Sequence, residues 1–306
     1  MKKQLDNISR RNFLALGGGI LGTLGAACGT KEPAKETADA AMSKALDAEA
    51  TEFPQDIPFA GFRVGVQSYC FREFKTREVL IDSLHSLGLA HIEIWPDGHL
   101  PVDTPEAEIA DAVKLFLDQG LTIDACGVVD FPNDEAQCRK IFEYAKKLGV
   151  IAISAGPAHE ALPLLVKLTA EYSLPIAIHN HGPQDTLFGT SALIRQYLGP
   201  LPASVGLCVD TGHFQRVGED PLAVITEFAD RVHGVHLKDM VKGANGEWED
   251  RIVGKGNLDL PALMKKLKEI GFKGYFSLEY ESDPSDPLPA MRECLQELRT
   301  ACQGLA

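Results

Sequence analysis

The chain has 306 residues, of which 45% are hydrophobic and 24% are charged, a composition that is ordinary for a globular enzyme. Its net charge is −13 at pH 7, and no run of lysines or arginines beyond the N-terminal segment would form a basic patch. An acidic surface repels polyphosphate, so the charge argues against nucleic acid as a partner.

The first residues form a pattern typical of an export signal. Arg10 and Arg11 directly precede an uncharged, glycine-rich run over residues 14–29. That run is too short and too rich in glycine for a membrane span, which needs about 20 apolar residues. We therefore predict a twin-arginine signal over residues 1–28, with export to the periplasm.

Cys28 ends a segment, residues 24–28, that resembles a lipoprotein cleavage box, although Leu24 lies one place further upstream than is usual. Cleavage near Ala27, which would release a soluble protein, is the alternative. Residues 29–58 are rich in Ala, Glu, Lys and Asp and are predicted to form a flexible linker. Because a lipid anchor needs such a tether, the sequence favours an anchor at Cys28.

From residue 59 onward, short apolar runs alternate with amphipathic segments at intervals close to the length of one βα unit. Gly88, Gly120, Gly149 and Gly271 suit helix C-caps just before the next strand. The pattern predicts a single (β/α)8 TIM barrel over residues 59–306. An open doubly wound sheet is the alternative, but residues 67–70 are not the glycine-rich phosphate loop that would follow its first strand. The apolar runs begin near Phe62, Ala90, Leu121, Val150, Pro175, Ser204, Val232 and Gly274.

Two further features belong to the barrel. Its six cysteines are predicted to be buried free thiols rather than disulfides, because Cys126 and Cys208 lie inside strand-like runs. The longest insertion, residues 238–258, follows the seventh strand and is expected to form an active-site loop. Within it, Trp248 could supply an aromatic wall and Arg251 a cation to a bound ligand.

Polar side chains follow four of the predicted strands. In a barrel of parallel strands the carboxyl ends open onto one face, so these side chains should converge. Two imidazoles and two carboxylates form a metal site that can polarise a substrate oxygen. Taken alone, Asp210 could be a helix cap, and His236 could be a packed core histidine. His181 rather than His179 could be the residue whose side chain faces the site. The polar residues are His179, Asn180 and His181, then Asp210 and His213, then His236 and Lys238, and finally Glu279.

The segments VGLCVDTGHF, HGVHLKD, GEWEDRIVGKGNLDL and YFSLEYE resemble the xylose isomerase-like TIM-barrel superfamily, which includes sugar isomerases and epimerases, inosose dehydratase and the endonuclease IV group. The resemblance implies that Asp210, His236 and Glu279 bind a divalent metal. It also implies that His213 and Arg251 contact substrate oxygens, with Lys238 beside them. His179 stands where many relatives have a ligand glutamate, and imidazole binds Mn²⁺, Co²⁺, Fe²⁺ or Zn²⁺, with Mg²⁺ as a further option.

In epimerases of this superfamily, two opposed glutamates bind the metal and move protons on the two faces of the substrate. With His179 in place of one of them, Glu279 is the expected base for the proton next to a carbonyl, and His179 or His181 is the expected second proton carrier. The predicted catalytic residues are therefore Glu279, His179 and His213. The predicted substrate-binding residues are His181, His213, Arg251, Lys238, Glu93 and Trp248.

The sequence thus predicts an exported, divalent-metal-dependent isomerase or epimerase of an unphosphorylated sugar or keto-sugar. One alternative is a keto-glycoside lyase or dehydratase that expels a β-leaving group. Another is a non-catalytic sugar-binding lipoprotein. An endonuclease IV type of enzyme is disfavoured, because residues 67–70 and 154–156 supply no extra histidine ligands. Sugar identity and oligomeric state do not follow from the sequence.

Overall fold

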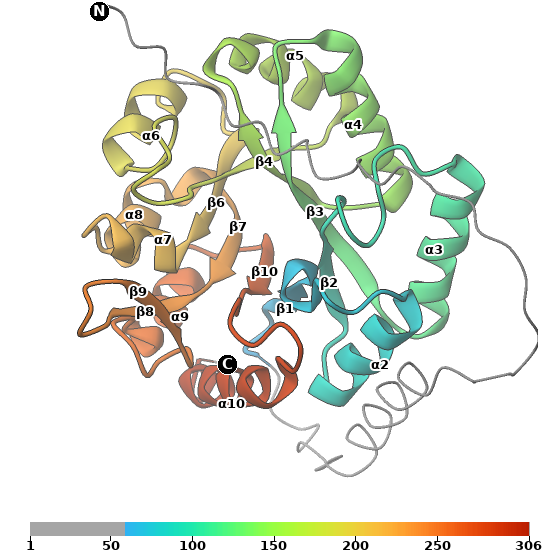
Figure 1. Cartoon of the computed structure of the whole chain (residues 1–306). Helices are drawn as coiled ribbons and strands as arrows, with labels where there is room; N and C mark the ends of the chain where they lie inside the picture. Colours follow the sequence, from blue (N-terminus) through green and yellow to red (C-terminus); the bar gives the residue numbers. More distant parts are fainter. Residues whose placement is uncertain (1–58, 306) are drawn as a thin grey trace, which may run out of the picture. The chain divides into compact units, whose positions relative to one another are not determined.

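Eight parallel strands close into a barrel, as the sequence predicted (Figure 1). The computed structural model describes residues 59–305, so the predicted signal and linker, residues 1–58, lie outside the described residues. Neighbouring strands follow one another around the barrel in the order β1-β10-β7-β6-β5-β4-β3-β2. Their bounds are β1 (Arg63–Gln67), β2 (His91–Ile94), β3 (Thr122–Phe131), β4 (Ala152–Pro157), β5 (Ile176–His179), β6 (Val205–Asp210), β7 (Val232–Leu237) and β10 (Tyr275–Leu278).

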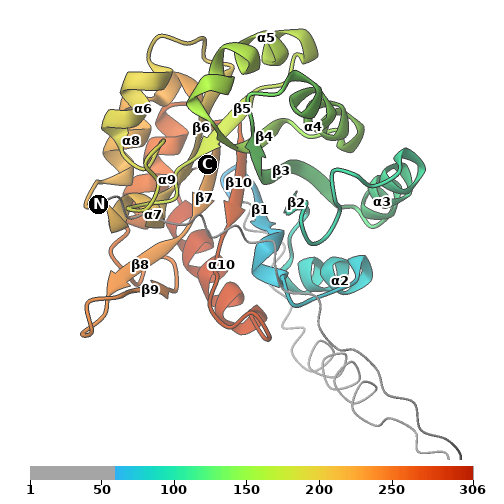
Figure 2. The ribbon, with the colours of Figure 1, turned by 45° about the horizontal axis from the view of Figure 1, so that its top comes forward.

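Helices surround the strands (Figure 2). Among residues 59–305, no helix has both the length and the apolar character needed to cross a membrane. The helices are α2 (Arg77–Leu87), α3 (Glu106–Asp118), α4 (Glu135–Leu148), α5 (Leu162–Tyr172), α6 (Ser191–Leu198), α7 (Thr211–Arg216), α8 (Pro221–Glu227), α9 (Leu260–Glu269) and α10 (Leu288–Cys302), with 3-10 turns η1 (Ser68–Phe71), η2 (His159–Ala161) and η3 (Ala229–Arg231).

Helix α2 illustrates how the sequence specifies these segments. The Thr76 side chain accepts a hydrogen bond from the Val79 amide and so caps the first turn. Leu80, Leu84 and Leu87 recur on one face and are fully buried. Gly88 then adopts a left-handed conformation (φ 66°), which turns the chain toward β2 as the C-cap pattern predicted.

Small side chains inside the barrel leave room for one large ring. Ala125, Ala152, Ala177 and Cys208 form a buried cluster with Tyr275. A β-carbon on Gly234 would overlap the Tyr275 ring, so glycine is required at that point of β7. Because side chains alternate along a strand, the residues two positions further toward the carboxyl ends face the same way. Counted from Ala177, Cys208, Gly234 and Tyr275, those residues are His179, Asp210, His236 and Ser277, so polar side chains lie above this part of the apolar layer.

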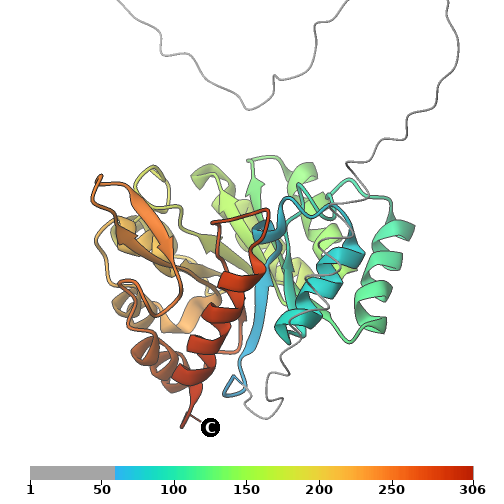
Figure 3. The same cartoon turned by 60° about the horizontal axis from the view of Figure 1, so that its bottom comes forward.

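The insertion after β7 is more regular than predicted. It forms an antiparallel hairpin of β8 (Asp239–Lys242) and β9 (Trp248–Arg251) rather than an irregular loop. Gly246 has a φ of 84°, which glycine adopts without strain in the tight turn. Figure 3 shows this hairpin at the end of the barrel away from the chain's C-terminus. The cysteine prediction is confirmed: all six cysteines in the described part of the chain are free and buried.

Candidate metal centre

The four predicted ligands come together at the carboxyl ends of their strands. His179 ends β5, Asp210 ends β6, His236 lies in β7, and Glu279 directly follows β10. One ligand atom from each residue lies within 4.8 Å of all the others, and all four side chains are buried. The register aligns Asp210 with His236 and His236 with Ser277, so these three residues lie at the same level of the barrel, and it aligns His179 with Cys208.

Two ligand atoms of this cluster fit a cation. His179 Nε2 and Asp210 Oδ2 are buried without a hydrogen-bond partner among the described residues, although they lie only 3.4 Å apart. An unpaired buried polar atom costs about 1–3 kcal/mol, and a cation among the four ligands would give each one a partner. Two nitrogen and two oxygen donors suit Zn²⁺, Mn²⁺, Co²⁺ or Fe²⁺ better than Mg²⁺, which prefers oxygen ligands.

Asp210 is held so that one of its oxygens faces the centre. Its backbone amide donates to Asn180 Oδ1 (2.9 Å), and its carbonyl accepts from Asn180 Nδ2 (3.2 Å). Asp210 Oδ1 caps helix α7 by accepting from the His213 amide (2.7 Å). The capping interpretation and the ligand interpretation of Asp210 therefore use different oxygens. No role was predicted for Asn180, which was noted only for its position after a strand.

His236 has a partner for each ring nitrogen. Nδ1 lies 3.1 Å from Glu279 Oε2, and Nε2 lies 2.7 Å from Glu93 Oε2. Glu93 lies in β2 and is fully buried, and it also accepts from Ser277 Oγ (2.8 Å). The sequence predicted that Glu93 contacts substrate, which stays a prediction; its contact in the structure is with His236.

Lys238, which was predicted to bind substrate, lies beside the ligand carboxylates, and its contact with substrate stays a prediction. Its buried Nζ is 3.3 Å from Glu279 Oε2 and 3.6 Å from Asp210 Oδ2. It also forms an ion pair with Glu281, a residue that the sequence analysis did not select. Burial opposes the charged form of Lys238, but the charges of Glu279 and Asp210 outweigh it and raise its pKa well above the ordinary value. Lys238 therefore carries a positive charge in the site.

Both ligand carboxylates of the cluster have cationic neighbours. Burial opposes ionisation of Asp210, but His213 and Lys238 outweigh it and lower the pKa of this carboxyl to about 2. Burial likewise opposes ionisation of Glu279, yet Lys238 and His236 hold its pKa well below the ordinary value. Burial opposes protonation of His179, but contacts with Asp210 and Glu279 raise its pKa. Both carboxylates are therefore ionised at neutral pH and face cationic groups, and a bound metal would replace protons.

The other two histidines lie next to the ligands. His181 Nδ1 is 3.4 Å from His179 Nδ1, and the charge of His179 lowers the pKa of His181 to about 4. Burial lowers the pKa of His213 to about 3, so its imidazole is neutral. Arg216 donates to His213 Nδ1 (3.0 Å), which leaves the proton on Nε2, 3.9 Å from Asp210 Oδ2.

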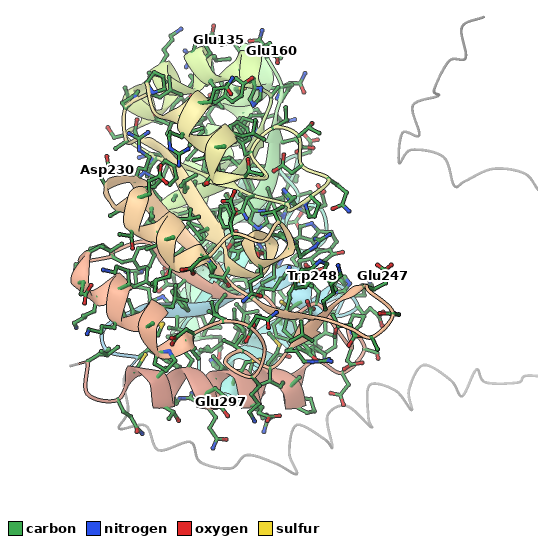
Figure 4. The ribbon with its side chains drawn as sticks, turned by 90° about the vertical axis from the view of Figure 1, so that its left-hand side faces the viewer. Glu135, Glu160, Asp230, Glu247, Trp248 and Glu297 are labelled. Atoms are coloured by element: carbon green, nitrogen blue, oxygen red, sulfur yellow. The ribbon has the colours of Figure 1, made fainter. Side chains whose placement is uncertain are left out.

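A cavity of about 570 Å³ is lined by Trp248 and Arg251 of the β8–β9 hairpin and by Glu281, which follows β10. In Figure 4, Trp248 and Glu247 lie on this hairpin. Because Glu281 also pairs with Lys238, the cavity adjoins the ligand cluster. Arg251 is exposed and pairs with Glu249 (2.8 Å) rather than with a member of the cluster. Substrate contact by Trp248 and Arg251 stays a prediction.

Comparison with known proteins agrees with this architecture. Residues 81–301 match the family model described as "xylose isomerase-like TIM barrel", so the chain belongs to this family. One relative is an inosose dehydratase of Geobacillus thermodenitrificans, 29% identical over 160 residues, which are 47% of this chain and 53% of that protein. The chain thus spans about half the length of this curated relative.

Two solved structures share the fold. The 3-keto-D-glucoside 4-epimerase YcjR from E. coli has a TM-score of 0.61 and 20% identity over 78% of this chain and 99% of that chain. The IOLI protein, described with a binding zinc atom, has a TM-score of 0.62 and 18% identity over 78% of this chain and 98% of that chain.

Proposed function

We propose that this protein is a metal-dependent isomerase or epimerase that acts by removing the proton next to the carbonyl of an unphosphorylated sugar or keto-sugar. The observation that carries the proposal is the convergence of His179, Asp210, His236 and Glu279 within 4.8 Å, with two of their buried ligand atoms lacking a hydrogen bond among the described residues. The zinc of the IOLI structure and the epimerase name of YcjR support it.

The described residues suit this chemistry. A divalent cation bound by the four ligands would polarise the substrate carbonyl and stabilise the negative charge that develops on its oxygen. Glu279 is ionised at neutral pH and is the carboxylate available to accept the α proton. The neutral His213 can donate a hydrogen bond from Nε2 to a substrate oxygen, and the positive Lys238 favours the anionic state of the substrate.

A second candidate reaction is dehydration. After Glu279 takes the α proton, the electron pair of that C–H bond can form a double bond as the β C–O bond breaks, and the leaving hydroxyl takes a proton and departs as water. Two observations favour this outcome: His179 stands in place of a second carboxylate base, and the relative reported above is named an inosose dehydratase. Both reactions begin with the same proton transfer and differ in the second step.

Metal content tests the site that both reactions need. We expect the purified protein to hold about one equivalent of a transition metal, and Asp210→Ala and Glu279→Ala each to lose it. Glu249→Ala is the matched control, because this carboxylate lies on the hairpin and pairs with Arg251 outside the cluster. Inductively coupled plasma mass spectrometry provides the measurement. A wild-type protein without metal after reconstitution with Mn²⁺, Co²⁺ and Zn²⁺ contradicts the proposal.

Products formed in deuterated water separate the two reactions. An isomerase or epimerase incorporates deuterium next to the carbonyl and keeps every oxygen of the keto-sugar. A dehydratase yields a product lighter by one water. Mass spectrometry of the products distinguishes these outcomes, and the Glu279→Ala variant should give neither product.

We also propose that the protein is exported through its N-terminal arginine pair and anchored by lipid at Cys28. Export supports an unphosphorylated substrate, because sugar phosphates are mainly cytoplasmic. Replacing Arg10 and Arg11 together by lysine should leave an uncleaved precursor in the cytoplasm. Cys28→Ala should move the mature protein from the membrane fraction to the soluble periplasmic fraction. Unchanged fractionation of either variant contradicts the corresponding part of the proposal.

A further inference from the structure

Glu93 reaches the metal centre from the opposite side of the barrel. It lies in β2, whereas the four ligands belong to strands β5, β6, β7 and β10, and 143 residues separate it from His236. Its side chain is 0% exposed. Within residues 59–305, no lysine or arginine is paired with this carboxylate. Burial of a carboxylate is costly unless it is paired, so its contacts with other side chains must account for its presence.

Those contacts concern one oxygen and one imidazole. Glu93 Oε2 lies 2.7 Å from His236 Nε2 and 2.8 Å from Ser277 Oγ. The other oxygen, Oε1, is buried and has no hydrogen-bond partner among the described residues. Oε2 therefore makes both contacts of this carboxylate, one with His236 and one with Ser277, and Oε1 makes none.

Because Glu93 contacts His236, the two ring nitrogens of this histidine have different partners. Nδ1 faces Glu279 Oε2 (3.1 Å) and therefore the ligand cluster, whereas Nε2 faces Glu93. A neutral imidazole can bind a metal through Nδ1 only if its proton is on Nε2. An acceptor at Nε2 favours that tautomer and fixes the ring plane, and metal-binding histidines commonly have such an acceptor.

We infer that Glu93 is a positioning residue of the metal centre: by accepting the Nε2 proton of His236, it holds the ring so that Nδ1 faces the cation. The inference rests on the metal site of the proposed function. It differs from the sequence prediction, in which Glu93 contacts substrate, because Glu93 acts here through His236. Its loss should weaken metal binding itself and not only turnover.

The affinity of the full chain for Zn²⁺ tests the inference. After bound metal has been stripped from the protein, the affinity is measured by competition for Zn²⁺ with a chromophoric chelator. We expect Glu93→Ala to bind Zn²⁺ about 10–100-fold more weakly than the wild type. Glu93→Gln should lose less, because its amide oxygen still accepts a hydrogen bond but lacks the charge that strengthens it. Ser277→Ala is the matched control: it removes the other donor to Oε2, keeps the Glu93–His236 contact, and should stay near wild-type affinity.

Two further measurements separate positioning from folding. Thermal unfolding of the metal-free proteins shows whether each variant is folded before titration, and Glu93→Gln keeps the test open if Glu93→Ala does not fold. The visible spectrum of bound Co²⁺, which reports ligand geometry, should change in the Glu93 variants and not in Ser277→Ala. In a His236→Ala background, the further change Glu93→Ala should cause no additional loss of affinity.

The inference is overturned if folded Glu93→Gln binds Zn²⁺ as tightly as the wild type. It is also overturned if Ser277→Ala loses as much affinity as Glu93→Ala, or if the two substitutions Glu93→Ala and His236→Ala weaken binding additively. Failure of the wild type to bind any metal is a different result, since it removes the proposed function together with the inference. The two failures are therefore distinguishable in one titration series.

Discussion

Charged residues at the two ends of the barrel strands have different partners and therefore different tasks. At the carboxyl ends, Asp210 and Glu279 are surrounded by imidazoles and by Lys238, and the buried Oδ2 of Asp210 has no hydrogen bond among the described residues. At the amino ends, Asp124 Oδ2 accepts a hydrogen bond from Arg63 Nε (2.9 Å) and lies 3.0 Å from His91 Nδ1. Chemistry concentrates at the carboxyl end of a TIM barrel, so the Asp124 cluster is expected to serve stability.

Asp124→Asn tests that expectation through pH. Burial opposes ionisation of Asp124, but contacts with Arg63 and His91 outweigh it and lower its pKa below 3.8. Because the folded-state pKa is the lower one, the stabilisation is fully present above the unfolded-state pKa and is lost as pH falls through the folded-state pKa. At pH 7 the variant should lose about 1–3 kcal/mol of unfolding free energy in urea titrations. The difference should shrink below about pH 4.

Glu171→Gln is the control for this prediction. Glu171 also pairs with an arginine, Arg139, but both side chains are partly exposed to solvent, where ion pairs contribute little. Its unfolding free energy should match that of the wild type at each pH. If Asp124→Asn behaves in the same way, the cluster at the amino ends does not contribute to stability.

The convergence of the four candidate ligands could be predicted from the sequence, because each stands at or near the end of an apolar strand. Their partners could not. The contact of Glu93 with His236 spans 143 residues and crosses the barrel, and the contact of Lys238 with Glu281 spans 43. Such contacts depend on strand tilt and side-chain reach, which leave no periodic trace in the sequence. Arg216, which fixes the tautomer of His213 from within the same helix α7, was also missed, although that contact is local in sequence.

At the scale of elements, the hairpin β8–β9 differs from the loop that was predicted for residues 238–258. One carboxylate organises the segment that follows the hairpin. Asp239 Oδ2 accepts from the amides of Gly254 and Gly256, and Oδ1 accepts from those of Asn257 and Leu258. A side chain that satisfies four amides at once converts a glycine-rich sequence into a fixed connection to α9. Turn propensities alone do not reveal it.

Asp239→Ala should therefore have both a local and a global effect. Four amides lose a charged acceptor, and we expect the unfolding free energy to fall by about 3 kcal/mol or more. Hydrogen exchange of residues 252–258 should accelerate by a larger factor than exchange in the barrel strands. Asp259→Ala is the control, since Asp259 accepts only the Ala262 amide as the N-cap of α9. An equal effect of both substitutions contradicts the organising role of Asp239.

At the scale of the whole molecule, the predicted start of every barrel strand agrees with the structure to within two residues. The alternation of apolar runs and amphipathic segments was enough to place the strands, because parallel strands covered on both sides are continuously apolar. Glycines in the left-handed conformation, such as Gly88 and Gly149, also mark helix ends. The export signal and linker stay predictions, since they lie outside the described residues.

The proposed metal centre would take its ligands from β5, β6, β7 and the residue after β10, so metal binding and folding should be linked. A cation that binds only the folded barrel stabilises it by about 2.7 kcal/mol at a free concentration 100-fold above Kd. For about 250 residues, this corresponds to a rise in Tm of roughly 5–10 °C. Calorimetry with added Zn²⁺ should show the rise in the wild type and none in Asp210→Ala. Because Asp210 also caps α7, the metal-free Tm of that variant should be lower as well; a variant whose Tm still rises with Zn²⁺ would show that the cation binds elsewhere.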